Sequence, residues 1–225
     1  MAERAEANTL PREVIGDLEA AGIARGRPVL AVDADEVLVA FAAHLAEWLQ
    51  LAGYEMRLKR YELEGSIYPI GDPVPLDFQA SIRLIDMFFE EETRNQRALE
   101  GAVEAVGRIA REAQVVVLTN IPRHARLSRV QNLAGLGIEV PVVANSGGKG
   151  RALAWLSDRA DAPCVFVDDS PQQIASAAKR AEAVGRIHFR GSPYIRPVLP
   201  TAREADAMVE DWSACEATIR RYLGL

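Results

Sequence analysis

Four short apolar runs, all rich in valine, constrain the fold more than any other feature of the sequence. They lie at residues 28–33, 114–119, 140–145 and 164–169, and a fifth candidate lies at 186–189. Their apolar residues are continuous rather than alternating, which is typical of strands buried on both faces of a parallel sheet. Segments with helical spacing follow the later runs. This alternation predicts a Rossmann-like, doubly wound parallel sheet of the α/β class.

Helical spacing of apolar residues marks several segments around these runs. It occurs over residues 127–133 after the second run and over 153–156 after the third. We also expect an N-terminal helix around residues 11–23 and a C-terminal helix around residues 204–223. Helices on both sides of the sheet are therefore predicted.

A long insert separates the first run from the second. About sixty residues lie between them, far more than a single crossover helix needs. Residues 41–54 and 77–91 have helical spacing, with a proline- and glycine-rich break between them. We therefore predict that residues 1–40 and 101–225 form the α/β core and that residues 41–100, called the insert below, form a small helical domain.

The insert is also rich in aromatic residues. Eight occur there: Phe41, Trp48, Tyr54, Tyr61, Tyr68, Phe78, Phe88 and Phe89. A small bundle needs bulky side chains in its core, and this explains most of them. The alternative is that some of them face a ligand, and periodicity does not separate the two.

The amino-acid composition limits the kinds of partner that the chain is expected to bind. The chain carries 32 acidic and 26 basic residues, for a net charge of −6, so no general attraction to nucleic acid or anionic membrane is expected. No apolar stretch approaches the length of a membrane span, and the first residues hold no apolar leader. The two cysteines lack metal-type spacing. We expect a cytoplasmic protein with a small phosphorylated substrate, and the sequence indicates no oligomeric state.

Polar residues end the apolar runs. Ligands of open parallel sheets bind beyond the carboxyl ends of the strands, so these residues should share one crevice. They are Asp33 and Asp35 after the first run, Thr119 and Asn120 after the second, Lys149 at the start of the helix after the third, and Asp168 and Asp169 after the fourth.

The four aspartates of this crevice predict a metal site. Four carboxylates so close together cannot all stay ionised without a cation, because like charges at short range repel strongly. A hard cation with oxygen ligands answers this need, and Mg²⁺ suits it best because it leaves coordination positions for water and phosphate. The predicted metal residues are Asp33, Asp35, Asp168 and Asp169.

The same crevice holds the groups that phosphoryl transfer requires. Asp33 can attack phosphorus as a nucleophile, and Asp35 can act as general acid and then as general base. Thr119 offers a hydroxyl group and Lys149 a positive charge to the transferring phosphate. The predicted activity is Mg²⁺-dependent hydrolysis of a phosphate monoester.

Three further residues are candidates for substrate binding. Asn120 and Arg123 follow the second run closely, and His44 lies on the first helix of the insert. Arg123 could touch a phosphate or a base, or lie in solvent in the first turn of a helix. His44 could face a ligand or make a structural hydrogen bond.

The chain resembles the haloacid dehalogenase-like hydrolase superfamily at four segments, which occur in the order of that family's motifs. "VLAVDADEVL" is similar to its first motif, "VVVLTN" to its second, the lysine of "GGKGRAL" to its third and "CVFVDDSP" to its fourth. The resemblance extends over about residues 28–190. It implies a phosphatase, with the insert as the helical C1 cap that covers the site and selects the substrate.

The resemblance also implies roles for individual residues. It implies Asp33 as the nucleophile, Asp35 as the acid/base, and a Mg²⁺ site made by Asp33, the backbone carbonyl of Asp35 and the Asp168–Asp169 pair. Within that pair it implies Asp169 as the direct ligand and Asp168 as a supporting residue. Glu36 departs from the family, which has glycine there. An inward-pointing Glu36 would disfavour a phosphate dianion, whereas an outward-pointing one would change nothing.

A narrower resemblance concerns the substrate. An insert ending in "FF" before "ALEGAVEAVGRIA", followed by "LTN" and "VDDSP", is similar to the 5'(3')-deoxyribonucleotidases. It implies a small phosphorylated metabolite, such as a nucleotide, as the substrate. The alternative function is a catalytically inactive binding or regulatory protein on the same scaffold, and the intact pair of Asp33 and Asp35 argues against it.

Overall fold

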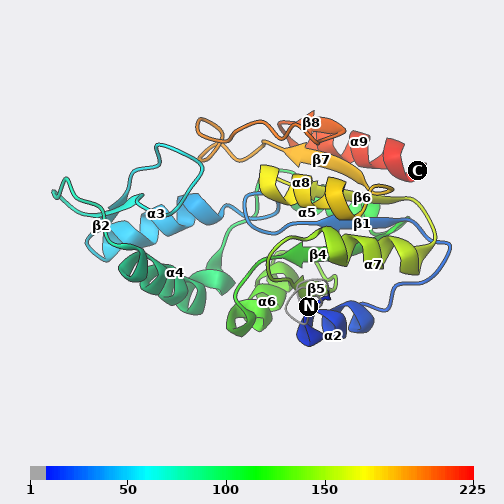
Figure 1. The fold of residues 1–225 in the computed structure, drawn as a ribbon, viewed down its shortest axis with the longest axis horizontal. Helices are drawn as coiled ribbons and strands as arrows, with labels where there is room; N and C mark the ends of the chain where they lie inside the picture. The colour runs from blue at the N-terminus through cyan, green and yellow to red at the C-terminus, as the bar shows by residue number, and fades with distance from the viewer. Residues whose placement is uncertain (1–8) are drawn as a thin grey trace, which may run out of the picture.

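A six-stranded parallel sheet forms the centre of the molecule (Figure 1). The computed structural model describes residues 9–225. The strand order is β5-β4-β1-β6-β7-β8, and every neighbouring pair is parallel. The strands are β1 (Val29–Val32), β4 (Gln114–Thr119), β5 (Val142–Ala144), β6 (Cys164–Asp168), β7 (Gly185–Phe189) and β8 (Ala207–Val209). The predicted α/β class and its parallel sheet are confirmed.

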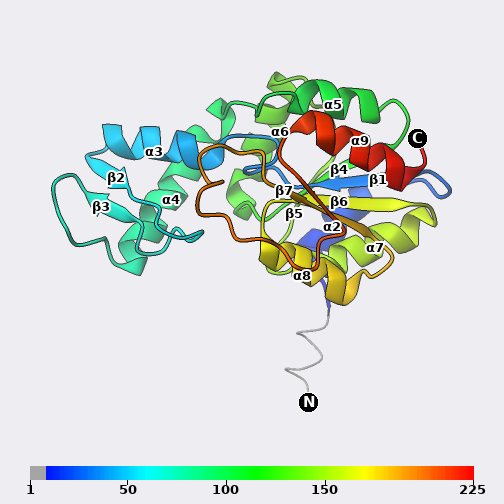
Figure 2. The same cartoon turned by 90° about the horizontal axis from the view of Figure 1, so that it is seen from above.

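Helices cover both faces of this sheet (Figure 2). One face packs against α2 (Arg12–Ala20), α7 (Gly150–Ala160) and α8 (Pro171–Arg180), and the other packs against α5 (Ala102–Ile109), α6 (Arg126–Gly135) and α9 (Trp212–Leu223). Successive strand residues point to opposite faces, so Val29 and Ala31 join the first core whereas Leu30 and Val32 join the second. This is why the strands read as continuous apolar runs.

The insert lies beyond the carboxyl ends of the strands in both views (Figures 1 and 2). It contains α3 (Phe41–Leu51), α4 (Phe78–Glu92), a short 3₁₀ helix η1 (Thr93–Asn95) and an antiparallel pair of strands, β2 (Tyr54–Met56) and β3 (Ile67–Pro69). The helices agree with the predicted ones, while the strand pair adds an element that helical spacing did not indicate. The loop between β2 and β3 points toward the sheet edge and supplies cavity residues described below.

Most aromatic residues of the insert serve its own core. The ring of Phe41 lies 5.5 Å from that of Phe88 and 5.3 Å from that of Phe89, and Trp48 packs on Phe88 at 5.8 Å. Leu45 is buried with them. The core interpretation is therefore correct for this group.

The C-terminal helix is shorter than predicted. Residues 207–209 form β8, which pairs with β7, and α9 begins only at Trp212. The carboxylate of Asp211 accepts a hydrogen bond from the amide of Ala214 at 2.7 Å, a typical N-cap that starts the helix there. Among the helices described, none is long and apolar enough to cross a membrane.

Candidate active site

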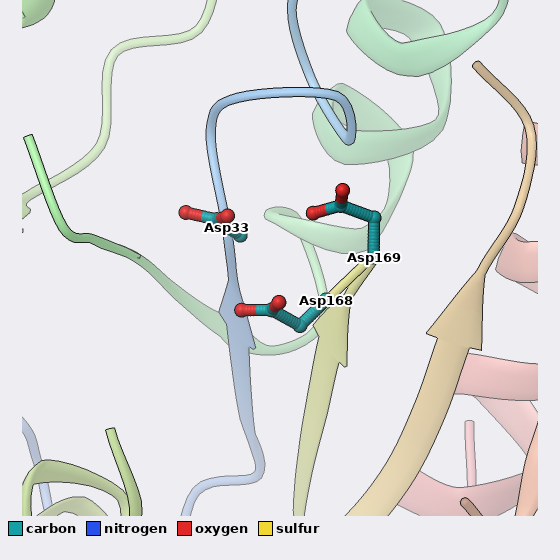
Figure 3. Close-up of side chains that lie close together, drawn as sticks. All are labelled: Asp33, Asp168 and Asp169. Carbon is teal, nitrogen blue, oxygen red and sulfur yellow. The ribbon is translucent and has the colours of Figure 1, made fainter. Parts of the chain in front are cut away.

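Three carboxyl groups meet where β1 and β6 end (Figure 3). The two strands are neighbours, with Val32 paired to Val167, and the amide of Asp33 donates to the carbonyl of Val167 at 2.9 Å. This register sets Asp33 beside Asp168, and Asp169 follows directly. Oxygen atoms of the three side chains lie within 4.8 Å of one another. The structure thus brings together three of the four aspartates that the sequence assigned to a metal.

Lys149 is inserted into this cluster from the start of α7. Its Nζ lies 2.8 Å from Asp33 Oδ1 and 2.6 Å from Asp168 Oδ2, and the residue is only 1% exposed. The first residue of α7 packs tightly on α8: a Cβ at Gly150 would lie 2.1 Å from the carbonyl oxygen of Ser176. Glycine at this position therefore lets the lysine approach the strand ends.

Burial dominates the electrostatics of the cluster. It is the main reason that the pKa values of Asp168 and Asp169 are raised, and neighbouring carboxyl groups add to the effect. Burial opposes the charge of Lys149, but the attraction of Asp168 and Asp33 outweighs it and raises the lysine pKa. Full ionisation of the three carboxyl groups would therefore need more positive charge than one ammonium group supplies.

Asp35 lies outside the group of three carboxyl groups and forms an ion pair that the sequence did not reveal. Its Oδ1 accepts a hydrogen bond of 2.5 Å from Arg129 Nη2, and Arg129, on α6, is fully buried. Burial is the main cause of a raised Asp35 pKa, and Arg129 works against it. Arg129 is held in turn by the side-chain oxygen of Asn132 at 3.0 Å. The inward face of α6 is thus polar at Arg129 and Asn132. The apolar spacing over residues 127–133 predicted that Leu127 would face inward, but its side chain is exposed.

Replacing Arg129 by methionine is expected to lower the free energy of unfolding by about 2–3 kcal/mol, because Asp35 would keep a largely buried charge without its partner. Urea denaturation measures this loss. Arg111→Met, at an exposed position, is the control and should change stability by less than about 0.5 kcal/mol. Equal stability of the two variants would show that the Asp35–Arg129 pair contributes nothing to the fold.

Thr119 and Asn120 are found at the end of β4, as expected. Thr119 is 1% exposed, and both residues line the same cavity as Asp33. The side-chain nitrogen of Asn120 donates to the carbonyl of Gly147 at 2.8 Å, and its oxygen accepts from Asn145 at 2.8 Å. Asn120 therefore fastens the loop that precedes Lys149.

Arg123 and His44, the other two candidates for substrate binding, do not line this cavity. Arg123, in the short 3₁₀ helix η2 (Arg123–Ala125), is directed to α2, where its guanidinium pairs with the buried carboxylate of Asp17. His44 Nε2 lies 3.1 Å from a carboxylate oxygen of Glu92, and its ring packs on Phe88. Each residue is thus engaged by a carboxylate outside the cavity.

A cavity of about 330 Å³ lies between the strand ends and the insert. Tyr61, from the loop between β2 and β3, reaches its floor and donates a hydrogen bond of 2.7 Å to Asp169 Oδ2. Burial is the main reason that the pKa of Tyr61 is raised, so the hydroxyl keeps its proton. Among the aromatic residues of the insert, Tyr61 and Phe41 thus line the cavity, as the alternative interpretation required.

Glu36 lines the cavity but is held by two hydrogen bonds. One carboxyl oxygen accepts from the amide of Ala42 in the first turn of α3, and the other accepts from the hydroxyl of Ser192. Burial raises the pKa of Glu36 to about 7. Its φ of 62° lies in the left-handed region that glycine adopts most easily. The side chain therefore joins the first turn of the insert to the loop after β7.

Solved structures of low sequence identity share this fold. A haloacid dehalogenase-like protein of unknown function from Agrobacterium tumefaciens is 21% identical, with a TM-score of 0.57 over 87% of this chain and 99% of that one. A hydrolase of the same family from Deinococcus radiodurans, with bound phosphate and sodium, is 16% identical, with a TM-score of 0.59 over 86% and 95%.

The magnesium-bound hydrolase YfnB from Bacillus subtilis is 12% identical, with a TM-score of 0.60 over 87% of this chain and 99% of that one. No family model and no curated protein sequence matches the chain. The matches span most of both chains. The chain therefore has the haloacid dehalogenase-like hydrolase fold.

Proposed function

We propose that the protein is a Mg²⁺-dependent phosphomonoesterase that works through an aspartyl-phosphate intermediate. The observation that carries the proposal is the position of Asp33, which is bound to Lys149, adjoins two further carboxyl groups and faces a cavity covered by the insert. Asp35, two residues further on, lines the same cavity. The proposed nucleophile, the lysine cation and the proposed acid/base thus all line one small cavity.

The carboxyl groups suit a magnesium ion. Both oxygens of Asp168 are engaged, one by Lys149 Nζ at 2.6 Å and the other by the amide of Ser170 at 2.8 Å. Asp33 and Asp169 thus offer the carboxylate oxygens for direct ligation, together with the backbone carbonyl of Asp35, and Asp168 positions the lysine. A bound Mg²⁺ would neutralise charge on the phosphoryl group.

The reaction then follows from the residues of the site. A carboxylate oxygen of Asp33 bonds to phosphorus while the bond to the leaving oxygen breaks, and Asp35 gives that oxygen a proton. Asp35 next takes a proton from the water that attacks phosphorus and frees Asp33. Lys149 and Thr119 are placed to stabilise the phosphoryl oxygens.

The similar structures support this proposal through what they bind. Phosphate and sodium are bound in the Deinococcus radiodurans hydrolase, and magnesium is bound in YfnB. The alternative, a binding protein without turnover, keeps the same ligands and loses only catalysis.

Phosphate release from a panel of nucleotides, sugar phosphates and phosphorylated acids, with Mg²⁺ or EDTA, tests the proposal. Release that needs Mg²⁺ is expected, and silence across the panel in a folded, Mg²⁺-binding protein would favour the alternative.

Magnesium is expected to stabilise the fold. At a concentration about a hundredfold above its Kd, the ion should add about 2.7 kcal/mol to the free energy of unfolding, because the unfolded chain lacks the site. Asp169→Asn should lose most of this gain, since the amide keeps the size of the side chain but not its charge. Asp158→Asn, on the exposed side of α7, is the matched control. Thermal melts with MgCl₂ or EDTA measure the effect, and identical gains in both variants would contradict the assignment of Asp169.

A further inference from the structure

We propose that the cavity selects phosphate monoesters whose leaving group is small, apolar and free of negative charge, so that a second anionic group on the substrate is rejected. This inference rests on the proposed function and names its substrate class. It is drawn from the residues that surround the cavity above the reaction centre.

Large apolar side chains make up part of the lining and are called the hydrocarbon wall below. They are Phe41, Leu58, Leu63, Ile195 and Val198. They come from three segments, which are the start of α3, the loop between β2 and β3, and the loop between β7 and β8. A leaving group that extends away from Asp33 would therefore contact hydrocarbon. At about 330 Å³ the cavity is at the small end of ligand sites, which suits a compact leaving group.

Most ionisable groups that line the cavity are carboxyl groups. Among the described residues that line it, Lys149 is the only cation, and it is committed to Asp33 and Asp168. The phosphate group of the substrate would be attracted by this lysine and by the metal, so neither cation would be left for a second anion. Glu36 and Glu62 also line the space, and the carboxylate of Glu62 lies 3.4 Å from the Arg60 guanidinium, which is not part of the lining. A second anion on the substrate would thus meet carboxyl groups, hydrocarbon or neutral polar side chains, and no further cation among the described lining residues would offset its loss of water.

The cationic side chains of the neighbouring loop face elsewhere. The loop between β2 and β3 carries Arg57, Lys59 and Arg60, and all three line a separate hollow. Arg57 pairs with Glu55 and stacks over the ring of Tyr68, with its Cζ 4.3 Å from the ring centre. The same loop turns Leu58, Tyr61 and Leu63 toward the cavity. The loop thus presents hydrocarbon on one side and positive charge on the other.

Three monoesters of equal length test the inference: hexyl phosphate, 6-aminohexyl phosphate and 5-carboxypentyl phosphate. They differ only at the end remote from phosphorus, so the reacting bond is the same in all three. We expect kcat/KM for hexyl phosphate to exceed that for 5-carboxypentyl phosphate by at least about tenfold, because charge repulsion and lost hydration act on the latter alone. The amino compound should also exceed the carboxylate.

A pair of charge reversals gives a matched control. Glu62 lines both the cavity and the separate hollow, whereas Glu64, two residues on, lines only the hollow. Glu62→Lys should raise the carboxylate-to-hexyl ratio of kcat/KM by about tenfold at low salt, because it replaces a carboxylate of the cavity lining by a cation. Glu64→Lys, with the same change in net charge, should leave the ratio within about twofold.

The outcomes separate this inference from the proposed function. If all three esters are hydrolysed and the carboxylate is as good a substrate as hexyl phosphate, the selectivity is wrong while the phosphatase stands. If none is hydrolysed, phosphate release from the wider panel decides whether the protein is a phosphatase, and the Kd values of the three esters, measured by calorimetry with excess MgCl₂, decide the selectivity. Tighter binding of hexyl phosphate than of the carboxylate would support it. Equal binding, or binding of neither, would overturn it.

Discussion

Asp33→Asn is expected to lower Mg²⁺-dependent phosphate release by at least about a thousandfold and to leave the protein folded. An amide oxygen is a poor nucleophile, so the covalent step is lost. Folding should survive because Lys149 keeps its 2.6 Å contact with Asp168, and because one charge fewer remains in a crowded cluster. The free energy of unfolding should stay within about 1 kcal/mol of wild type.

Steady-state kinetics with the best substrate of the panel, together with urea denaturation, measure both parts of this prediction. Asp158→Asn makes the same chemical change on the exposed side of α7 and should keep full activity. Turnover that persists in the folded Asp33→Asn protein would refute Asp33 as the nucleophile. Unfolding of the variant would instead show that Asp33 is a structural residue.

Lys149→Met is expected to have the second large effect, a loss of about 3–5 kcal/mol in the free energy of unfolding near pH 8, together with loss of turnover. The ammonium group is buried between Asp33 and Asp168, and breaking a buried ion pair leaves uncompensated charge. Methionine has a similar length, so packing changes little. Turnover falls because the phosphoryl group loses its only cationic side chain among the described cavity residues.

The pH dependence of this loss identifies its cause. Burial already raises the pKa of Asp168, and removal of the ammonium group raises it further. A carboxyl group whose pKa is raised on folding favours the folded state at low pH and loses that contribution as the pH rises through its folded pKa. The deficit of Lys149→Met should therefore be smaller at pH 5 than at pH 8, as measured by urea denaturation.

Two variants complete this experiment. Lys179→Met, at an exposed position on α8, should cost less than about 0.5 kcal/mol. The double variant Lys149→Met/Asp168→Asn should recover part of the lost stability, because it removes a charge that has lost its partner. A deficit that is independent of pH, with no recovery in the double variant, would mean that Lys149 acts through packing alone.

Local sequence predicted the strands and the residues at their ends. Continuous valine-rich runs occur only where both faces of a strand are buried, and parallel strands all end at the same edge of a sheet. These two facts are enough to place Asp33, Thr119 and Asp169 around one space. The structure places the three as this argument requires.

Position along the chain did not identify the arginine that contacts the site. Arg123 is a candidate because it follows Asn120 closely in the chain, yet it pairs with Asp17 on α2. Arg129, six residues later, contacts Asp35 across 94 residues of sequence. No local pattern tells which arginine of a helix faces inward, because a buried polar residue interrupts the apolar spacing that marks a helix face.

Tyr61 and Glu36 depend on tertiary structure for the same reason. Tyr61 is 108 residues away from Asp169, and Glu36 is 156 residues away from Ser192, so each contact exists only after the insert and the loop after β7 have packed on the strand ends. Chain direction and side-chain period place the carboxylates of the candidate site because both are local properties of the backbone. The partners that hold those carboxylates, and the hydrocarbon wall above them, are decided by packing between distant segments, which only the tertiary structure contains.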